Sequence, residues 1–282
     1  MLRATTATSR TESPAAFGET AIGMRNIAWR PRAAIVLLLR AVAVAVVLVA
    51  IWQAVVLIFA PPVFMLPPPA RVFTALISRP DLWQVHAVTT LTESVLGLLI
   101  GTALGVLLAL AMSFVPLTRR VLLPVMVVSQ AVPVFAIAPL LALWFGFGLA
   151  SKMVMATIAI FFPVASAFSD GLARTDQNLI DLAQLYRAKR TDVVALLRVP
   201  SALPSLITGI RLAAVYAPIA APIGEWVGAS SGLGYAMLFA NARAQTDVMF
   251  AALFLLAAMS VGLRALIDLL TANLTPWAPE TT

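Results

Sequence analysis

One short motif in this chain has the spacing of a catalytic site. Residues 228–232, Gly-Ala-Ser-Ser-Gly, match the G-x-S-x-G pattern, in which a serine on a strand-to-helix turn attacks an acyl group. That chemistry also needs a histidine as general base and an acid. His86 is the only histidine, and the preceding Glu225-Trp226-Val227 is typical of the end of an apolar helix rather than of a strand. A membrane-bound serine hydrolase is therefore an alternative with little support.

Other catalytic and cofactor chemistries lack the residues they require. The chain has no cysteine and a single histidine, which excludes a disulfide framework and a multi-histidine metal site. A phosphate-binding loop needs Gly-Lys-Ser/Thr, and neither Lys152 nor Lys189 follows a glycine. We therefore expect no catalytic residue, no bound metal or cofactor, and no ATPase site in this chain.

A few polar residues in apolar segments are candidates for a transport path or gate. An acid within a membrane span is expensive and often functional, which favours Glu93 and Glu225, the latter with its neighbour Trp226. The alternative is structural. Glu225 would be hydrogen-bonded to the adjacent loop, Glu93 would have the same kind of structural role, which is favoured for it, and Gln130 would bond to a neighbouring helix. His86 is expected to lie in a loop.

The elements that carry these residues follow from composition. Apolar residues make up 61% of the 282 residues, charged residues 11%, and the mean hydropathy is +0.98. In soluble domains about 45–50% of the residues are apolar and about 25% are charged. The sequence therefore predicts an all-α polytopic membrane protein. Six segments are long enough to span a bilayer: residues 33–60, 90–114, 121–147, 153–168, 203–227 and 248–270.

The segments around these spans have their own patterns. Residues 1–32 and 277–282 are expected to be tails, and short helices are expected at 71–77 and 235–242. Glycines four positions apart in the second span allow close helix contact: Gly97, Gly101 and Gly105. The third span contains three prolines, which predicts that it is buried in the bundle: Pro124, Pro133 and Pro139.

The stretch from Thr175 to Gly209 is the long polar interruption of this apolar chain, with six charged residues between positions 181 and 198. Its pattern predicts a short amphipathic helix capped by Thr175 or Asp176, a turn, a second short helix, and a stop at Pro200. The first helix has one apolar face at helical spacing, made of Leu179, Leu182, Leu185 and Tyr186. Such a helix either lies on a membrane surface or is gripped by a soluble partner.

Arginine and lysine set the expected orientation. With the N-terminus inside, 15 of the 19 basic residues fall in inside segments and 4 in outside loops. Inside loops of membrane proteins carry such an excess. Both termini and the polar stretch are therefore predicted to be cytoplasmic.

With the segments in this order, the chain resembles the permease subunit of a bacterial ABC importer of the type I fold, in the nitrate/sulfonate/taurine group. The family's cytoplasmic signature, E-A-A-x3-G followed by a proline-containing segment, reads here Asp181-Leu182-Ala183, then Arg187, then Leu197-Arg198-Val199-Pro200, with Pro204 and Gly209 following. Supporting segments are LPPPARVFTAL (66–76) and PVFAIAPLLALWFGFG (133–148). The resemblance runs from about Leu66 to the sixth span.

Arg187 departs from that signature, because the family has glycine in the turn. Glycine permits a left-handed backbone, which costs other residues about 1–2 kcal/mol. Either Arg187 adopts this conformation, or the turn is reshaped and stays helical.

The resemblance implies a mechanism and partners. Residues 175–200 would be the coupling stretch that docks into a separate ATP-hydrolysing subunit, with ATP and Mg used by that subunit. Its contact residues would be Asp181, Leu182, Ala183, Leu185, Tyr186, Arg187 and Lys189. The assembly would comprise an ATPase dimer, a second permease copy (homodimer), and a periplasmic or lipid-anchored binding protein, in the inner membrane and without nucleic acid.

The outer segments point to a substrate class. GEWVGASSGLGY (224–235) and NARAQTDVMFAALFLL (241–256) look most like permeases for pyrimidine precursors of thiamine, of the hydroxymethylpyrimidine or formylaminopyrimidine type. The alternative is nitrate, taurine or alkanesulfonates. A secondary transporter would need inverted repeats, and residues 33–150 and 151–270 show no internal similarity.

Overall fold

The computed structural model describes residues 31–277. The chain divides into two units, residues 1–48 and 49–282, and α1 (Pro31–Phe59) crosses the boundary between them. The predicted tails, 1–32 and 277–282, lie almost wholly outside the described residues. All the helices discussed below belong to the second unit, and residues 31–277 contain no strand.

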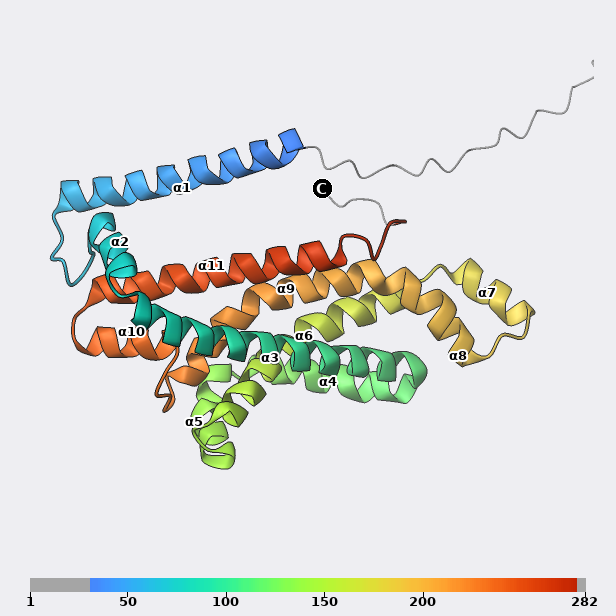
Figure 1. The fold of residues 1–282 in the computed structure, drawn as a ribbon. Helices are drawn as coiled ribbons and strands as arrows, with labels where there is room; N and C mark the ends of the chain where they lie inside the picture. Colours follow the sequence, from blue (N-terminus) through green and yellow to red (C-terminus); the bar gives the residue numbers. More distant parts are fainter. Residues whose placement is uncertain (1–30, 278–282) are drawn as a thin grey trace, which may run out of the picture. The chain divides into compact units, whose positions relative to one another are not determined.

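Four long helices form the body of the second unit (Figure 1): α3 (Pro80–Phe114), α6 (Leu149–Ala173), α9 (Val199–Glu225) and α11 (Thr246–Thr271). α6 packs against both α3 and α9, and α9 packs against α11. The predicted glycine face is where α3 meets α6. A Cβ on Gly97, Gly101 or Gly105 would lie only 2.5–2.8 Å from atoms of Ala156, Ile160 or Phe161. Only glycine allows this close approach, and the predicted close helix contact is confirmed.

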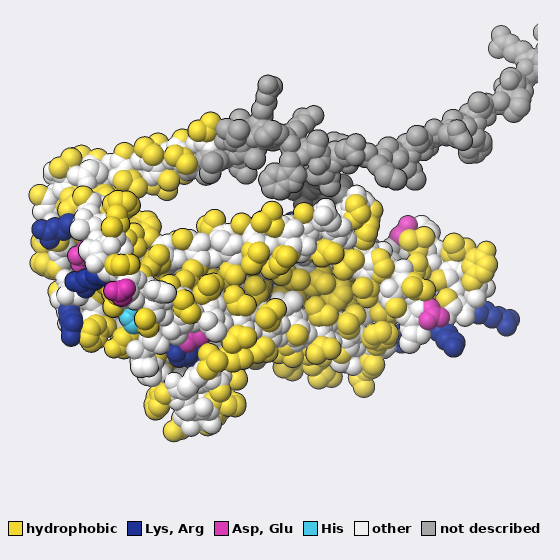
Figure 2. Space-filling model, in the orientation of Figure 1, with side chains coloured by type: hydrophobic (Ala, Val, Ile, Leu, Met, Phe, Trp, Pro, Cys, Tyr) yellow, Lys and Arg dark blue, Asp and Glu magenta, His cyan; other side chains and the backbone are white. Residues whose placement is uncertain are grey.

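Apolar side chains also cover the outside of the bundle. On the face shown in Figure 2, hydrophobic side chains cover the middle and most charged side chains lie near the ends. Leu107 and Val261 are examples of exposed apolar residues on the long helices. Within the described residues, five helices are long and apolar enough to cross a membrane, or six if a bent pair counts as one span.

The predicted third span, residues 121–147, is a bent pair of helices and not one straight helix. Its predicted burial in the bundle is wrong for this chain, because many of its apolar side chains, such as Val125 and Leu143, are exposed. The pair consists of α4 (Pro116–Ala131) and α5 (Val134–Phe145), whose axes differ by 98°. The break has a local cause at Pro133: Val132 before it has extended angles, φ −82° and ψ 118°, and a residue that precedes proline avoids the helical region. Pro124 and Pro139 lie inside the two helices without ending them.

Short elements lie at opposite ends of the bundle (Figure 1). α2 (Pro69–Ser78) and α10 (Leu233–Ala242) are at one end and confirm the short helices predicted at 71–77 and 235–242. α7 (Gln177–Leu185) and α8 (Arg190–Asp192) are at the other end. α3 begins at Pro80, ten residues before the predicted span, so His86 lies in a helix and not in a loop.

The predicted stop at Pro200 is also wrong. A π-helical turn, η1 (Val193–Arg198), leads from α8 directly into α9, and Pro200 lies in the first turn of α9. Proline is tolerated in a first turn because its missing N–H would have had no partner there. Residues 190–225 therefore form one continuous helical path.

Candidate functional site

α7 is a short helix fixed at both its start and its inner face. The Asp176 side chain accepts a hydrogen bond from the Asn178 N–H at 2.9 Å, so Asp176 is the cap. Thr175, the other predicted cap, is buried and donates instead to the Leu172 carbonyl. Ile180 is the buried residue of α7, and it anchors the helix to the bundle.

The outer face of α7 is apolar and exposed. Leu182 is half-exposed, while Leu185 and Tyr186 are 80% and 81% exposed. Leu179, on the same predicted face, is 44% exposed. Three adjacent large apolar side chains at the tip of a small projection form a surface suited to a complementary groove. We refer to Leu182, Leu185 and Tyr186 as the α7 knob.

The turn after the knob is a Schellman motif, a standard helix C-terminal turn. The Ala188 N–H donates to the Ala183 carbonyl and the Arg187 N–H to the Gln184 carbonyl, both at 2.9 Å. This motif places its C′ residue in the left-handed region, and Arg187 has φ +56°. Of the two predicted alternatives, the left-handed one is therefore correct, and the helical one is wrong.

Charged and small residues surround the knob. Asp181 accepts a hydrogen bond from the Gln177 side chain at 2.9 Å, and Lys189 immediately precedes α8. Both are exposed, as is Arg187, while Ala183 is half-buried. All seven residues predicted for the coupling contact thus lie on one short helix–turn segment.

This segment is connected to the bundle by a stiff path. The Arg190 guanidinium donates to the Ser113 carbonyl at 3.4 Å, and Val193 and Val194 of η1 are buried. Because η1 runs directly into α9, a force applied at α7 and α8 would be transmitted to a long helix of the bundle.

At the opposite end, Glu225 holds the loop that follows α9. Its Oε1 accepts from the Thr90 hydroxyl at 2.6 Å, and its Oε2 accepts from the Gly234 and Tyr235 N–H groups at 2.5 and 3.2 Å. The Thr90 oxygen also accepts from the Leu233 N–H at 2.7 Å. Glu225 is 1% exposed. The loop-bonded alternative for Glu225 therefore describes the structure, and the buried carboxylate fixes the start of α10 against α3 and α9.

Glu93 has a different partner, which the sequence did not reveal. The Lys152 Nζ of α6 lies 2.6 Å from Glu93 Oε1 of α3, and the side chains are 10% and 2% exposed. Lys152 is a lone lysine in an apolar segment, and this alone could have indicated a buried ion pair. Glu93 could not be identified as its partner without knowing that α3 packs against α6. Thr90, the hydrogen-bond partner of Glu225, was likewise not identified from the sequence.

The serine motif does not form a nucleophile elbow. Residues 228–232 follow helix α9 rather than a strand. His86 does lie close to this loop, but its Nδ1 accepts from the Gly232 N–H at 3.0 Å. Within residues 31–277 no hydrogen bond joins His86 to Ser230 or Ser231. His86 therefore helps to hold the loop. The serine–histidine arrangement that a serine hydrolase needs is not present among the described residues.

Trp226 and Gln130, the other two residues predicted for the path or gate, are exposed in this chain. Trp226 donates from its indole N–H to the Gly234 carbonyl at 3.1 Å, next to the Glu225 contacts. Gln130 lies at the end of α4, just before the α4–α5 break, far along the chain from the Glu225 cluster. The structure thus brings Glu93, Glu225 and Trp226 to one end, and Gln130 lies on a separate element.

Comparison with known proteins places these features in a family. The model of the binding-protein-dependent transport system inner membrane component matches residues 101–278. A probable ABC transporter permease protein of Haemophilus influenzae is 46% identical over 82% of this chain and 94% of its own length. The formylaminopyrimidine transport permease protein ThiX of Halalkalibacterium halodurans is 34% identical over 82% of this chain and 92% of its own length. The taurine transport system permease protein TauC of Escherichia coli is 33% identical over 84% of this chain and 88% of its own length.

A solved structure shares the fold. A chain of the MetNI methionine ABC transporter, in an inward-facing conformation, matches with a TM-score of 0.54 and 20% identity over 67% of this chain and 92% of that chain. The expected type I permease fold is confirmed, and a secondary transporter is excluded. The chain belongs to the family of binding-protein-dependent transport system inner membrane components, and it is a multi-pass permease subunit of an ABC importer.

Proposed function

We propose that the α7 knob couples this permease to the ATP-hydrolysing subunit that its family implies. The observation that carries the proposal is the exposure of Leu185 and Tyr186, 80% and 81%, on a helix that Ile180 and η1 hold to the bundle. Docking in a groove would bury these side chains, and closure of the ATPase dimer would then move η1 and α9 together. Asp181, Arg187 and Lys189 would form the polar rim of the contact.

The other partners follow from the same assignment. A single six-span chain provides half of a transport path, so a homodimer is proposed. The excess of arginine at the α7 end supports a cytoplasmic location for that end, and both termini are proposed to be cytoplasmic as well. A periplasmic or lipid-anchored binding protein would then deliver substrate at the end formed by α2 and α10.

The substrate proposed is a pyrimidine precursor of thiamine. Sequence identity does not separate the candidates, because ThiX and TauC relatives are 34% and 33% identical. Charge within the long helices supports this choice, because Lys152 of α6 is neutralised by Glu93. The arginines near that end, Arg71, Arg79 and Arg243, lie in or beside the short helices α2 and α10. An anion such as taurine or nitrate would favour free cationic groups along its route, whereas a neutral or cationic heterocycle would not.

Glu225 and Trp226 are proposed to act at a gate. Both contact the segment from Gly232 to Tyr235, so a movement of this segment would break their hydrogen bonds together. Glu93 and Gln130 are kept as candidates for the path itself.

Growth and uptake test the substrate directly. A strain without its own pyrimidine synthesis should need this permease when hydroxymethylpyrimidine or a formylaminopyrimidine is limiting, and labelled precursor should enter only with the permease present. If deletion abolishes only the use of taurine, alkanesulfonates or nitrate, the substrate belongs to that branch and the coupling role is unaffected.

A further inference from the structure

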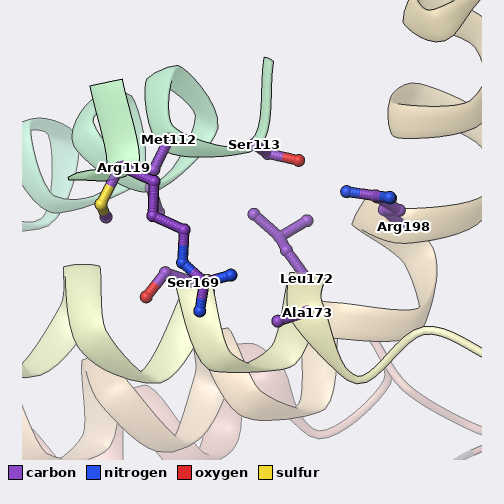
Figure 3. Close-up of a pocket in the computed structure, with 8 residues that line it drawn as sticks. Met112, Ser113, Arg119, Ser169, Leu172, Ala173 and Arg198 are labelled. Carbon is purple, nitrogen blue, oxygen red and sulfur yellow. The ribbon is translucent and has the colours of Figure 1, made fainter. Parts of the chain in front are cut away.

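A small cavity lies near the α7 end of the bundle, between α3, α4, α6 and η1. Its volume is about 50 Å³, which is room for about three or four waters. Figure 3 shows the side chains around it. Those that carry polar groups are Ser113, Arg119, Ser169 and Arg198.

The two arginines approach the cavity from different elements. Arg119 of α4 reaches toward Ser169 of α6, while Arg198 of η1 points toward Ser113 and Leu172 (Figure 3). None of the residues lining the cavity is acidic. In the described part of the chain, no carboxylate forms an ion pair with either arginine.

Two polar atoms at this cavity lack hydrogen-bond partners. They are the Arg198 Nε and the Ser113 Oγ, both buried as atoms. A buried donor without an acceptor is costly, and a cationic one more so. Arg190 is close by as well, and it already uses the Ser113 carbonyl. Within the described residues, the Arg198 Nε is therefore left without an acceptor.

We propose that this cavity binds a phosphate group. Two guanidinium groups and the unpartnered Ser113 hydroxyl line a space about as large as the oxygens of one phosphate, and arginine pairs well with such oxygens. The Ser169 hydroxyl already donates to the Ser166 carbonyl at 3.0 Å, so it could only accept there. The N-terminal end of α4, which begins at Pro116, adds partial positive charge. The group would come either from free phosphate or from an anionic lipid headgroup.

Binding there would link η1 to the body of the bundle. Arg198 is the last residue of η1, and α9 begins at the next position. A phosphate held between Arg198 and Arg119 would restrain η1 relative to α4. The site would therefore set how freely the segment beyond α7 moves, independently of which substrate is carried.

The test uses the full-length chain purified in a non-ionic detergent and, separately, in nanodiscs. In detergent, thermal unfolding is measured with sodium phosphate and with sodium chloride at equal ionic strength. We expect phosphate to raise the Tm by about 3 °C or more at ten times its dissociation constant. In nanodiscs of phosphatidylglycerol and phosphatidylcholine, native mass spectrometry measures which lipid stays bound.

The variants Arg119→Gln and Arg198→Gln should weaken phosphate or phosphatidylglycerol binding at least about tenfold. The matched control is Arg120→Gln, which removes the neighbouring charge outside the cavity and should bind normally. A phosphate effect without selective phosphatidylglycerol retention identifies free phosphate as the source, and selective phosphatidylglycerol retention identifies lipid.

The proposal is overturned if the wild-type chain prefers neither phosphate over chloride nor phosphatidylglycerol over phosphatidylcholine. It is also overturned if Arg120→Gln weakens binding as much as the two cavity variants. Should one cavity variant fail to fold, the other still decides, because the proposal is overturned if a folded cavity variant binds phosphate and phosphatidylglycerol as tightly as the wild type.

Discussion

Lys152 on α6 and Glu93 on α3 form a buried ion pair, with Nζ and Oε1 2.6 Å apart. The second oxygen of Glu93 has no hydrogen-bond partner within the described residues. The pair therefore neutralises a carboxylate that has little other support. It also joins the two helices that pack through the glycine face of α3.

Breaking this pair should destabilise the protein strongly. Lys152→Met keeps an unbranched side chain of nearly the same length but leaves Glu93 as an uncompensated buried charge, which costs about 3–5 kcal/mol. The double variant Lys152→Met/Glu93→Gln should recover much of the loss, because no charge remains. Thermal unfolding of the purified proteins measures both effects. If the double variant is no more stable than Lys152→Met, the pair is not the reason for the loss.

The turn before α10 should not tolerate a side chain at Gly232. This residue has φ +121°, and a Cβ would overlap the Glu225 carboxylate. Gly232→Ala should therefore displace the start of α10, lower the Tm by several degrees and reduce transport. Gly148→Ala is the matched control, since a Cβ there meets nothing within 4 Å. Equal Tm values for the two variants would contradict the arrangement around Glu225.

Glycine at position 187 should be accepted. Because Arg187 has φ +56°, Arg187→Gly should relieve a conformational cost of about 1–2 kcal/mol in the folded state. Glycine also raises the entropy of the unfolded chain, which offsets part of this gain in stability. The net change in the free energy of unfolding should lie between zero and about +1 kcal/mol. Gln184→Gly, inside α7, should instead cost about 1 kcal/mol. A destabilising Arg187→Gly would show that the turn is not left-handed in solution.

Single cysteines can test the orientation, because the chain has none of its own. With an impermeant thiol reagent on intact cells, Arg243→Cys should be labelled and Lys189→Cys should be labelled only after the cells are opened. Labelling at position 189 from outside would reverse the proposed topology.

Much of the helical layout could be predicted from hydrophobic runs and small-residue spacing, as Gly97, Gly101 and Gly105 illustrate. The errors occur at prolines and at helix starts. Pro133 separates α4 from α5, whereas Pro200 is accommodated in a first turn, and the local sequence alone does not distinguish the two cases. His86 was assigned to a loop because α3 extends beyond its apolar core.

In the candidate site, too, the features set by neighbours in sequence could be predicted and the contacts between distant residues could not. The α7 helix, a cap at Thr175 or Asp176, and the apolar face could be predicted, because all three depend on neighbours in sequence; the structure selects Asp176 as the cap. The partners of Glu93 and Glu225 could not be predicted, since Lys152 and Thr90 lie 59 and 135 positions away from them, respectively. Such contacts depend on how the helices pair, and a single sequence does not encode that pairing in a local pattern.

The central claim is that the α7 knob docks into the ATPase subunit, and co-purification tests it most directly. Leu185→Asp or Tyr186→Asp would place an unpaired charge in a buried contact, which costs several kcal/mol. Leu274→Asp is the matched control, because it makes the same change at another exposed leucine. Both α7 variants should insert normally into the membrane but lose the ATPase subunit and transport, while the control keeps both. Normal recovery of the ATPase subunit with both α7 variants would contradict this claim.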